Sequence, residues 1–283
     1  MTIPIIAERH PRDSLLRLDR LPHIWCPGCG LGKVISAYSK AINNSGIERN
    51  KHVVISGIGC SGRASGYLDL DSYHTTHGRA IAFATGMKLA NPELQVTVIS
   101  GDGDLSTIGG NHLIHAARRN INLNVILVNN FTYGMTGGQA SATTPYGAKT
   151  STTIKGNYDH PFNLPFLMRA SGATHIARWT VLHHRQLQES IEKAFAHDGF
   201  SFIEALSPCP KGFGKKNSFR NAIDTMHYFE GRSELEEHAD LAQLEIDMDP
   251  HHDVIVGEFF SEDKTPYFES KDKFFHYIGG KTA

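Results

Sequence analysis

The stretch that determines the fold class is QVTVISGDGD, residues 95–104. Its first six residues are rich in β-branched side chains and predict a strand, which runs into the turn Gly101-Asp102-Gly103-Asp104. Residues 110–119 have the apolar spacing of a helix, and residues 125–129 predict the next strand. A strand, a helix and a second strand in this order predict a parallel sheet covered by helices.

The same alternation continues on both sides of this stretch. Helices are expected at 31–42, 80–90 and 182–196, and strands at 53–56 and 200–205. The predicted fold class is therefore α/β, with an open, mostly parallel sheet flanked by helices.

The chain divides into three predicted parts. Residues 1–22 read as an N-terminal arm, residues 23–217 as the main domain and residues 218–283 as a C-terminal extension, in which acidic and aromatic residues become more frequent. The extension either covers a surface or reaches a partner subunit, or it is a partly ordered tail.

The composition is that of an ordinary globular protein, with 40% hydrophobic and 20% charged residues. A formal net charge of −1 argues against a nucleic-acid partner and against binding to a membrane surface. No apolar run reaches the length of a membrane span, and residues 1–20 lack the apolar core of a signal peptide. We therefore expect a cytoplasmic protein, in which thiols stay reduced.

Two polar groups follow neighbouring strands of the predicted sheet. Asp102 comes after the strand at 95–100, and Asn130, 28 positions later, comes after the strand at 125–129. A carboxylate and an amide oxygen suit Mg²⁺, and glycines with a following helix suit phosphate. The pair predicts a magnesium–diphosphate site. The alternatives are an ordinary Gly-Asp turn and a dinucleotide fold, although the latter needs an acid at the end of the second strand.

All four cysteines lie in turns rich in glycine or proline. Cys26 and Cys29 lie in WCPGCG, Cys60 in GIGCSG and Cys209 in SPCP. Four thiolates can bind a tetrahedral zinc ion or a [4Fe–4S] cluster, and their number does not separate these two. A thioredoxin-type redox motif at the first pair needs a strand just before it, and residues 21–24 make a poor strand.

Taken together, six short blocks resemble the beta subunits of the 2-oxoacid:ferredoxin oxidoreductases. The blocks are WCPGCG (25–30), GIGCSGR (57–63), HGR (77–79), GDGD (101–104), HAARRN (115–120) and YGMTGGQ (133–139). The resemblance spans roughly residues 22–215. The residues in these blocks are most similar to those of the members that act on 2-oxoglutarate. Residues 101–130 look like the thiamine diphosphate signature of thiamine enzymes.

The resemblance implies three cofactors: thiamine diphosphate, Mg²⁺ and one [4Fe–4S] cluster. The implied cluster ligands are Cys26, Cys29, Cys60 and Cys209. The implied magnesium ligands are Asp102, Asn130 and the carbonyl of Thr132. The residues implied to contact thiamine diphosphate are Ile58, Gly59, Cys60, Ser61, His77, Gly103, Asp104, Gly134 and Met135.

The implied reaction is the oxidative decarboxylation of a 2-oxoacid with coenzyme A, which gives an acyl-CoA and CO₂ and reduces ferredoxin, or the reverse reaction as a CO₂-fixing synthase. In this family a second subunit supplies the glutamate that activates thiamine, and no glutamate here is an obvious replacement. We therefore expect the chain to be inactive alone and to work with an alpha subunit, as an αβ pair that is itself doubled.

The expected substrate is 2-oxoglutarate, with pyruvate or a broad range of 2-oxoacids as alternatives. Arg63 is the candidate for binding a substrate carboxylate, since a guanidinium matches a carboxylate with two hydrogen bonds. Otherwise it is a solvated or salt-bridged arginine. Two other classes of protein compete with this interpretation: a thiamine lyase or synthase without redox chemistry, and a non-catalytic binding module held together by zinc.

Overall fold

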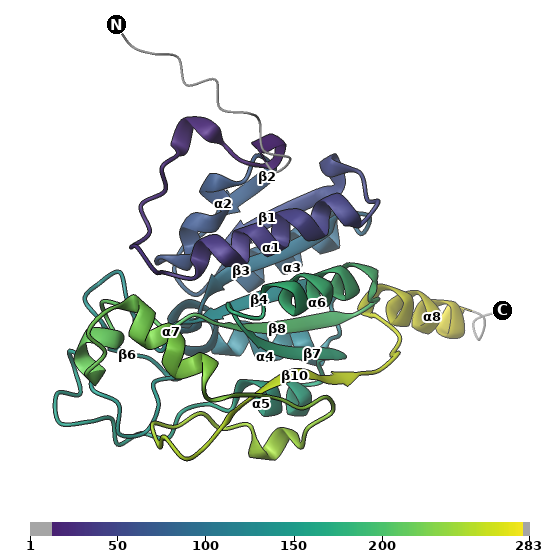
Figure 1. Cartoon of the computed structure of the whole chain (residues 1–283). Helices are drawn as coiled ribbons and strands as arrows, with labels where there is room; N and C mark the ends of the chain where they lie inside the picture. The colour runs from purple at the N-terminus through teal and green to yellow at the C-terminus, as the bar shows by residue number, and fades with distance from the viewer. Residues whose placement is uncertain (1–12, 280–283) are drawn as a thin grey trace, which may run out of the picture.

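The structure is a computed structural model in which residues 13–279 are described. These residues form an eight-stranded sheet in the order β2-β1-β3-β4-β8-β7-β10-β9 (Figure 1). The strands are β1 (His52–Ser56), β2 (Asp71–His74), β3 (Gln95–Gly101), β4 (Leu123–Asn129), β7 (His175–Thr180), β8 (Phe200–Leu206), β9 (Ser233–Leu235) and β10 (Val254–Ser261). A separate hairpin joins β5 (Thr132–Tyr133) and β6 (Gln139–Ala140).

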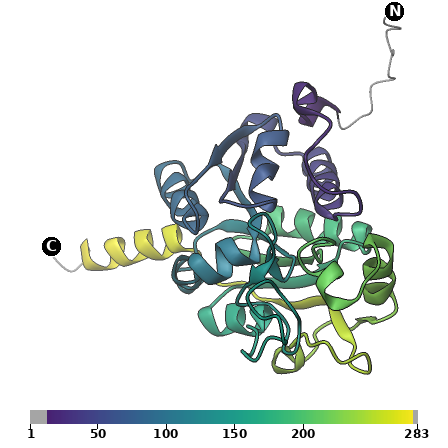
Figure 2. The same cartoon turned by 90° about the vertical axis from the view of Figure 1, so that its left-hand side faces the viewer.

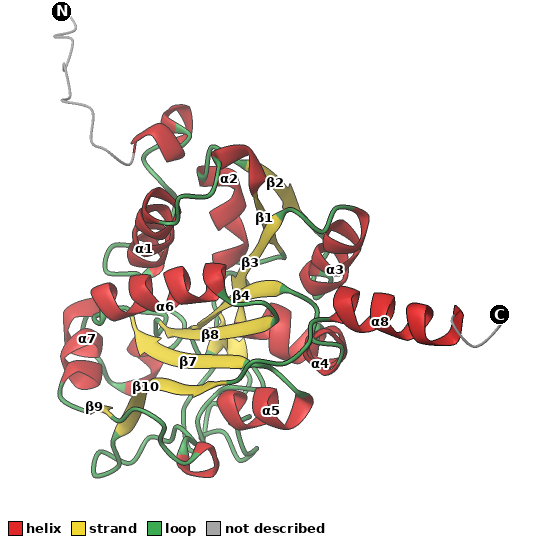
Figure 3. Cartoon of the chain, turned by 90° about the vertical axis from the view of Figure 1, so that its right-hand side faces the viewer, coloured by secondary structure: helices red, strands yellow, loops and turns green. Residues whose placement is uncertain are grey.

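The central strands are parallel, and only β10 runs antiparallel to its neighbour β7. Helices cover both faces of this sheet (Figure 3). One face carries α1 (Leu31–Asn44), α2 (Ala64–Tyr67) and α6 (His184–Ala196), and the other carries α3 (Ala80–Ala90), α4 (Gly110–Arg118) and α5 (Leu164–Ser171). The predicted α/β class is therefore confirmed.

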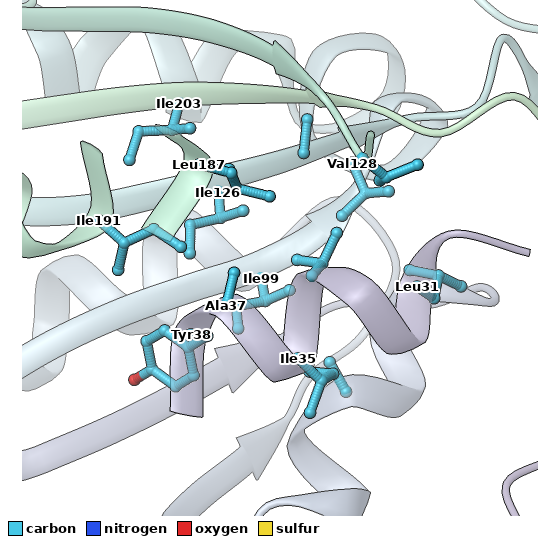
Figure 4. Packing of buried hydrophobic residues seen from close by; sticks show 14 of the residues in the cluster. Leu31, Ile35, Ala37, Tyr38, Ile99, Ile126, Val128, Leu187, Ile191 and Ile203 are labelled. Atoms are coloured by element: carbon cyan, nitrogen blue, oxygen red, sulfur yellow. The ribbon is translucent and has the colours of Figure 1, made fainter. Parts of the chain in front are cut away.

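Alternate residues of each strand supply the two layers of the core. Ile99, Ile126 and Ile203 face the layer of α1 and α6 (Figure 4), and their neighbours Val98 and Val125 pack on the opposite layer. This alternation follows from the two-residue period of a strand. Each fully buried branched side chain contributes about 1.5–3 kcal/mol relative to exposure.

The C-terminal extension contributes to the same sheet. Its strand β10 pairs with β7, and β9 pairs parallel to β10. Between them and the main domain, α7 (Ala222–Glu230) packs on the first cysteine turn, where a Cβ built on Gly28 would lie 2.1 Å from that of Ala222. The last helix, α8 (Tyr267–Gly279), projects from the body (Figure 2). The boundary at residue 218 stays a prediction.

Residues 13–22 of the predicted arm lie against α2 and the segment that follows it. The Arg17 Nε–H donates to the carbonyl of Leu68 at 2.9 Å, and Leu16 forms an isolated bridge with Leu68. The rest of the predicted arm, residues 1–12, lies outside the described residues. Across 13–279, no helix combines the length and apolar character that a membrane span requires.

Candidate functional site

Four parallel strands, β1, β3, β4 and β8, end at one edge of the sheet. The turns that follow them are residues 57–62, 101–104, 130–132 and 207–210, which carry most of the predicted site residues. Backbone hydrogen bonds join two of these turns: the amide of Ser207 donates to the carbonyl of Asn129 at 2.8 Å, and that of Cys209 to the carbonyl of Asn130 at 3.3 Å. In open α/β sheets, ligands bind at this edge.

A first cavity, of about 100 Å³, lies between the turns after β1, β3 and β4. We call it the Asp102 cavity. Every residue that the sequence predicts to contact thiamine diphosphate or Mg²⁺ lines it. These residues are Ile58, Gly59, Cys60, Ser61, His77, Asp102, Gly103, Asp104, Asn130, Thr132, Gly134 and Met135.

The Asp102 carboxylate is 1% exposed and is held by neutral donors. Its Oδ2 accepts hydrogen bonds from the hydroxyls of Ser141 at 2.5 Å and Thr143 at 2.8 Å. Its Oδ1 accepts from the backbone amide of Asn130 at 3.2 Å. Burial raises the pKa of Asp102, and these three hydrogen bonds oppose that shift. A cation beside the carboxylate would supply a positive charge, which none of these neutral hydrogen-bond donors provides.

The surroundings of Asp102 fit a hard divalent cation and a phosphate group. Asn130 lines the same cavity, and its side-chain Oδ1 accepts from the backbone amide of Thr132 at 3.1 Å. The Thr132 hydroxyl oxygen is buried with no hydrogen-bond partner. Oxygen donors of this kind are what Mg²⁺ prefers. Gly103 is required sterically, because a Cβ there would lie 2.5 Å from the Tyr133 ring. Residues Gly103–Ile108 form the π-helix η5, a type of turn that is frequent at functional sites.

Asp104 acts on the site through protein donors. Its Oδ1 accepts from the ring Nδ1 of His77 at 2.5 Å, from the amide of Gly78 at 2.7 Å and from the amide of Ile58 at 3.0 Å. Its Oδ2 accepts from Ser100 at 2.9 Å. The carboxylate therefore fixes the tautomer of His77, with the proton on Nδ1, and ties the turn after β1 to the one after β3.

A second cavity, of about 290 Å³, is lined by all four cysteines. We call it the cysteine cavity. It shares Cys60, Asn130, Gly134 and Met135 with the Asp102 cavity, so the two spaces are neighbours. Cys60 and Cys209 reach it from the turns after β1 and β8, and Cys26 and Cys29 from the turn before α1.

All four cysteines are partly buried, and backbone donors lie nearby. Burial raises the pKa of Cys29 to about 11, and its closeness to the three other thiols adds to the shift. Burial also raises the pKa of Cys60, with Cys209 and Cys26 adding and Arg63 opposing. The amide of Gly212 donates to Cys209 Sγ at 3.1 Å, and the Trp25 indole donates to the carbonyl of Cys60 at 2.8 Å. Among residues 13–279, no three His, Cys, Asp or Glu side chains are arranged to hold a single metal ion.

Arg63 lies outside the walls of both cavities. It is exposed at the end of the 3₁₀ turn η4 (Ser61–Arg63), and its amide donates to the carbonyl of Cys60 at 3.3 Å. Of the predicted site residues, it alone is absent from the linings of the two cavities.

Sequence reasoning missed five residues that line the Asp102 cavity or hydrogen-bond to the Asp102 carboxylate. Gly101, Tyr133 and Thr136 complete the lining, and Ser141 and Thr143 hold the carboxylate. The signal that could have found the two hydroxyl residues is the long polar loop at 130–161, because loops of such length are often functional. Its many serines and threonines do not reveal which of them face Asp102.

Comparison with known proteins shows the family of this chain. Residues 57–205 match the model of the thiamine pyrophosphate enzyme C-terminal TPP binding domain. The chain is 49% identical to the 2-oxoglutarate synthase subunit KorB of Methanothermobacter marburgensis over 256 residues, which are 89% of this chain and 88% of the relative. It is 42% identical to the 2-oxoacid:ferredoxin oxidoreductase subunit beta of Saccharolobus solfataricus, covering 82% of this chain and 71% of the relative.

A solved structure is similar over nearly the whole chain. It is the 2-oxoglutarate:ferredoxin oxidoreductase from Magnetococcus marinus with 2-oxoglutarate, coenzyme A and succinyl-CoA bound, with a TM-score of 0.83 and 32% identity over 98% of this chain and 94% of that one. Membership of a family of enzyme subunits excludes the binding module without catalysis. This chain belongs to the beta subunits of the thiamine diphosphate-dependent 2-oxoacid:ferredoxin oxidoreductases.

Proposed function

We propose that this beta subunit serves the oxidative decarboxylation of 2-oxoglutarate, with coenzyme A as acyl acceptor and ferredoxin as electron acceptor. Relatives named 2-oxoglutarate synthase subunit KorB, at 46–49% identity, support this substrate, as does the bound 2-oxoglutarate and coenzyme A in the similar solved structure. Pyruvate or a broader range of 2-oxoacids is the second candidate, supported by relatives named for 2-oxoacids in general.

Asp102, Asn130 and the Thr132 carbonyl would hold Mg²⁺, which would bind the diphosphate of thiamine diphosphate in the Asp102 cavity. Bound thiamine diphosphate supplies the electron sink that decarboxylation of a 2-oxoacid requires. The chain's own residues position it. Asp104 holds His77 with Nδ1 protonated, which leaves the ring Nε2 to meet the cofactor.

Cys26, Cys29, Cys60 and Cys209 would hold one [4Fe–4S] cluster in the cysteine cavity. All four thiols line one cavity of about 290 Å³, and four cysteine thiolates are the ligand set of such a cluster. The observation that carries the proposal is the shared wall: Cys60 and Asn130 line both cavities. These shared residues would hold the two groups side by side, and a cluster there would supply a one-electron acceptor next to the thiamine site.

An alpha subunit would complete the site. The Asp102 cavity, at about 100 Å³, is smaller than the roughly 300–1,000 Å³ of most small-molecule sites. Ile58 and Met135 at its rim are 39% and 43% exposed, and Ile154 and Tyr158 in the following loop are 77% and 78% exposed. Apolar side chains exposed around a half-built site suit a partner subunit. The proposed assembly is an αβ pair, itself doubled, in the cytoplasm, where thiols stay reduced.

The test uses the αβ complex purified without oxygen. Reduction of ferredoxin should require coenzyme A and should have a higher kcat/KM with 2-oxoglutarate than with pyruvate or 2-oxobutyrate. The beta chain alone should be inactive with all three. A preference for pyruvate would overturn the substrate, and activity of the isolated chain would overturn the shared site.

A further inference from the structure

A buried chain of polar contacts leads from strand β7 across the neighbouring strands β8 and β4 to Asp102. The Arg178 Nε–H donates to Glu204 Oε2 at 2.7 Å, and the Asn129 amide donates through Nδ2 to Glu204 Oε1 at 2.7 Å. Arg178 is anchored in turn on the carbonyl of Leu244 at 2.8 Å. Arg178 and Glu204 are 1% exposed and Asn129 is 2% exposed. None of these three residues lines the Asp102 cavity.

Asn129 connects the two turns that carry the proposed magnesium ligands. Its Oδ1 accepts from the backbone amide of Phe131 at 3.1 Å and lies 3.0 Å from the Thr143 hydroxyl oxygen, whose one proton it shares with Asp102. The same Thr143 hydroxyl lies 2.8 Å from Asp102 Oδ2. The Asn129 side chain is therefore linked to the Asp102 turn through Thr143 and to the Asn130–Thr132 turn through Phe131.

The Asn130–Thr132 turn depends on that support because its central residue is strained. Phe131 has φ of +65°, in the left-handed region that costs free energy for a residue with a side chain. Its amide is bound by Asn129, its carbonyl accepts from the Thr144 hydroxyl at 2.6 Å, and its ring is buried against Phe213 and Phe229. This conformation sets the directions in which Asn130 and the Thr132 carbonyl point.

The acceptor at residue 204 and the backbone amide of Phe131 together fix the Asn129 amide in the required orientation. Both carboxylate oxygens of Glu204 accept, so Asn129 must turn its NH₂ group toward Glu204 and its oxygen toward Phe131 and Thr143. A buried ion pair such as Arg178–Glu204 adds little net stability by itself. Orientation of the Asn129 amide would explain the presence of the Arg178–Glu204 pair, which a gain in stability does not explain.

We propose that Glu204, held by Arg178, is a positioning residue for the magnesium site, acting through the amide orientation of Asn129. The inference rests on the proposed magnesium site at Asp102, Asn130 and Thr132. Outer-shell partners of metal ligands typically change metal affinity by about 10–100-fold when mutated.

The central experiment exchanges the carboxylate of Glu204 and the side-chain amide of Asn129 between these two positions. In Glu204→Gln, one side-chain oxygen remains for two donors, Arg178 Nε–H and the Asn129 NH₂. The charged Arg178 should keep that oxygen, so the Gln NH₂ faces that of Asn129, and when Asn129 turns its amide the bond to the Phe131 amide is lost. In Asn129→Asp, two carboxylates face each other. In the double variant Glu204→Gln/Asn129→Asp, the Gln NH₂ donates to the new carboxylate, which also accepts from Phe131 and Thr143. The net charge is that of the original pair.

The readout is the Kd for Mg²⁺, from calorimetric titration of the EDTA-treated αβ complex at a fixed concentration of thiamine diphosphate. Each single variant should weaken Mg²⁺ binding by about 10–100-fold. The double variant should return to within about threefold of the original Kd, a coupling expected of residues in contact or in one hydrogen-bond network. Glu93→Gln removes one carboxylate from an exposed ion pair with Lys51 and should leave the Kd unchanged.

A second pair of variants covers the case in which changes at Glu204 prevent folding. Thr143→Val keeps the shape of the side chain and removes the hydroxyl that links Asn129 to Asp102, so it should also weaken Mg²⁺ binding. Thr143→Ser keeps the hydroxyl and should bind Mg²⁺ like the original.

Two results would overturn the positioning role: an unchanged Kd in Glu204→Gln, or a double variant as weak as the weaker single variant. If the singles and Thr143→Val lower only the melting temperature and not Mg²⁺ affinity, the network is structural and the inference is wrong. If the unmutated complex itself binds no Mg²⁺, the proposed metal site fails as well, which is a separate outcome.

Discussion

The backbone amide of Cys209 donates a hydrogen bond of 3.3 Å to the carbonyl oxygen of Asn130. Cys209 lines the cysteine cavity only. Asn130 lines both cavities and is a proposed magnesium ligand. This peptide contact therefore links the proposed cluster site to the proposed cofactor site, in addition to Cys60, which lines both cavities. Because the contact lies between the ends of two parallel strands, β4 and β8, the sheet itself sets the separation of the two centres.

Removing the hydroxyl of Ser141 should weaken magnesium binding. The hydroxyl donates to Asp102 Oδ2 at 2.5 Å and helps keep this buried carboxylate ionised. We expect Ser141→Ala to raise the Kd for Mg²⁺ by about 10–100-fold in the αβ complex with thiamine diphosphate present. Calorimetric titration measures this change. Ser151→Ala, in the same loop but exposed, is the control and should bind like the original; equal Kd values for all three proteins would contradict the role of Ser141.

A methyl group at residue 57 should disturb the site and the fold together. A Cβ built on Gly57 would lie 1.8 Å from Asp104 Oδ2, the carboxylate that also holds Ile58 and His77. We expect Gly57→Ala to destabilise the protein by about 1–3 kcal/mol, as overpacking of a close-packed site does. The free energy of unfolding in urea is the measurement.

The matched control for Gly57 is Gly86 in helix α3. A Cβ there meets nothing within 4 Å. Gly86→Ala should therefore stabilise the helix by about 0.5–1 kcal/mol. We expect the free energy of unfolding to fall in Gly57→Ala and to rise in Gly86→Ala. An unchanged or raised free energy of unfolding for Gly57→Ala would show that the Asp104 carboxylate can move without cost.

The buried ring of His52 should make the protein sensitive to acid. Burial lowers the pKa of His52 from 6.5 to about 4, and that of His175 likewise to about 4. Between pH 6.5 and 4 the unfolded chain binds protons that the folded chain does not. The stabilisation from the neutral rings is therefore fully present above pH 6.5 and is lost as the pH falls toward 4.

Replacement of His52 isolates its share of this effect. Between pH 7 and pH 5, His52→Leu should lose about 2 kcal/mol less unfolding free energy than the original chain does. His251→Leu, at an exposed position, is the control and should keep the original dependence on pH. Parallel curves for all three proteins would contradict the assignment.

Arg63 is the remaining candidate for substrate recognition. It is exposed beside the Cys60 turn and could reach a second carboxylate of a substrate that extends out of the Asp102 cavity. We expect Arg63→Ala to raise the KM for 2-oxoglutarate by about 10–100-fold, since a hydrogen bond between charged groups contributes about 1.5–3 kcal/mol. The KM for 2-oxobutyrate, which lacks that carboxylate, should change little. Equal changes for the two substrates would exclude the role.

Much of the fold could be predicted where strands and helices follow simple patterns. The helix at 80–90 is confirmed at both ends, and the strand at 95–100 extends by one residue to Gly101. Strands β7 and β10 escaped prediction. In β7, Arg178 is fully buried, and a charged residue inside a strand hides its apolar pattern until its partner Glu204 is known.

The residues of the site could be predicted from short sequence motifs, but the residues that hold them in place could not. Asp102 and Asn130 follow predicted strands, so their meeting at one sheet edge could be deduced. Ser141 and Thr143 reach Asp102 from a loop with little regular structure, and no periodicity specifies how such a loop folds. The position of Arg63 likewise depends on the η4 turn after Cys60, which sequence spacing does not determine.

Iron content tests the central claim most directly: four thiols from three distant segments hold a cluster beside the thiamine site. The measurement compares iron, zinc and thiamine diphosphate in the αβ complex and in its Cys209→Ala variant, both purified without oxygen. The variant should lose about four iron atoms per beta chain and all ferredoxin reduction, while it keeps thiamine diphosphate. Unchanged iron in the variant, or about one zinc and no iron at this site in the original complex, would contradict the account.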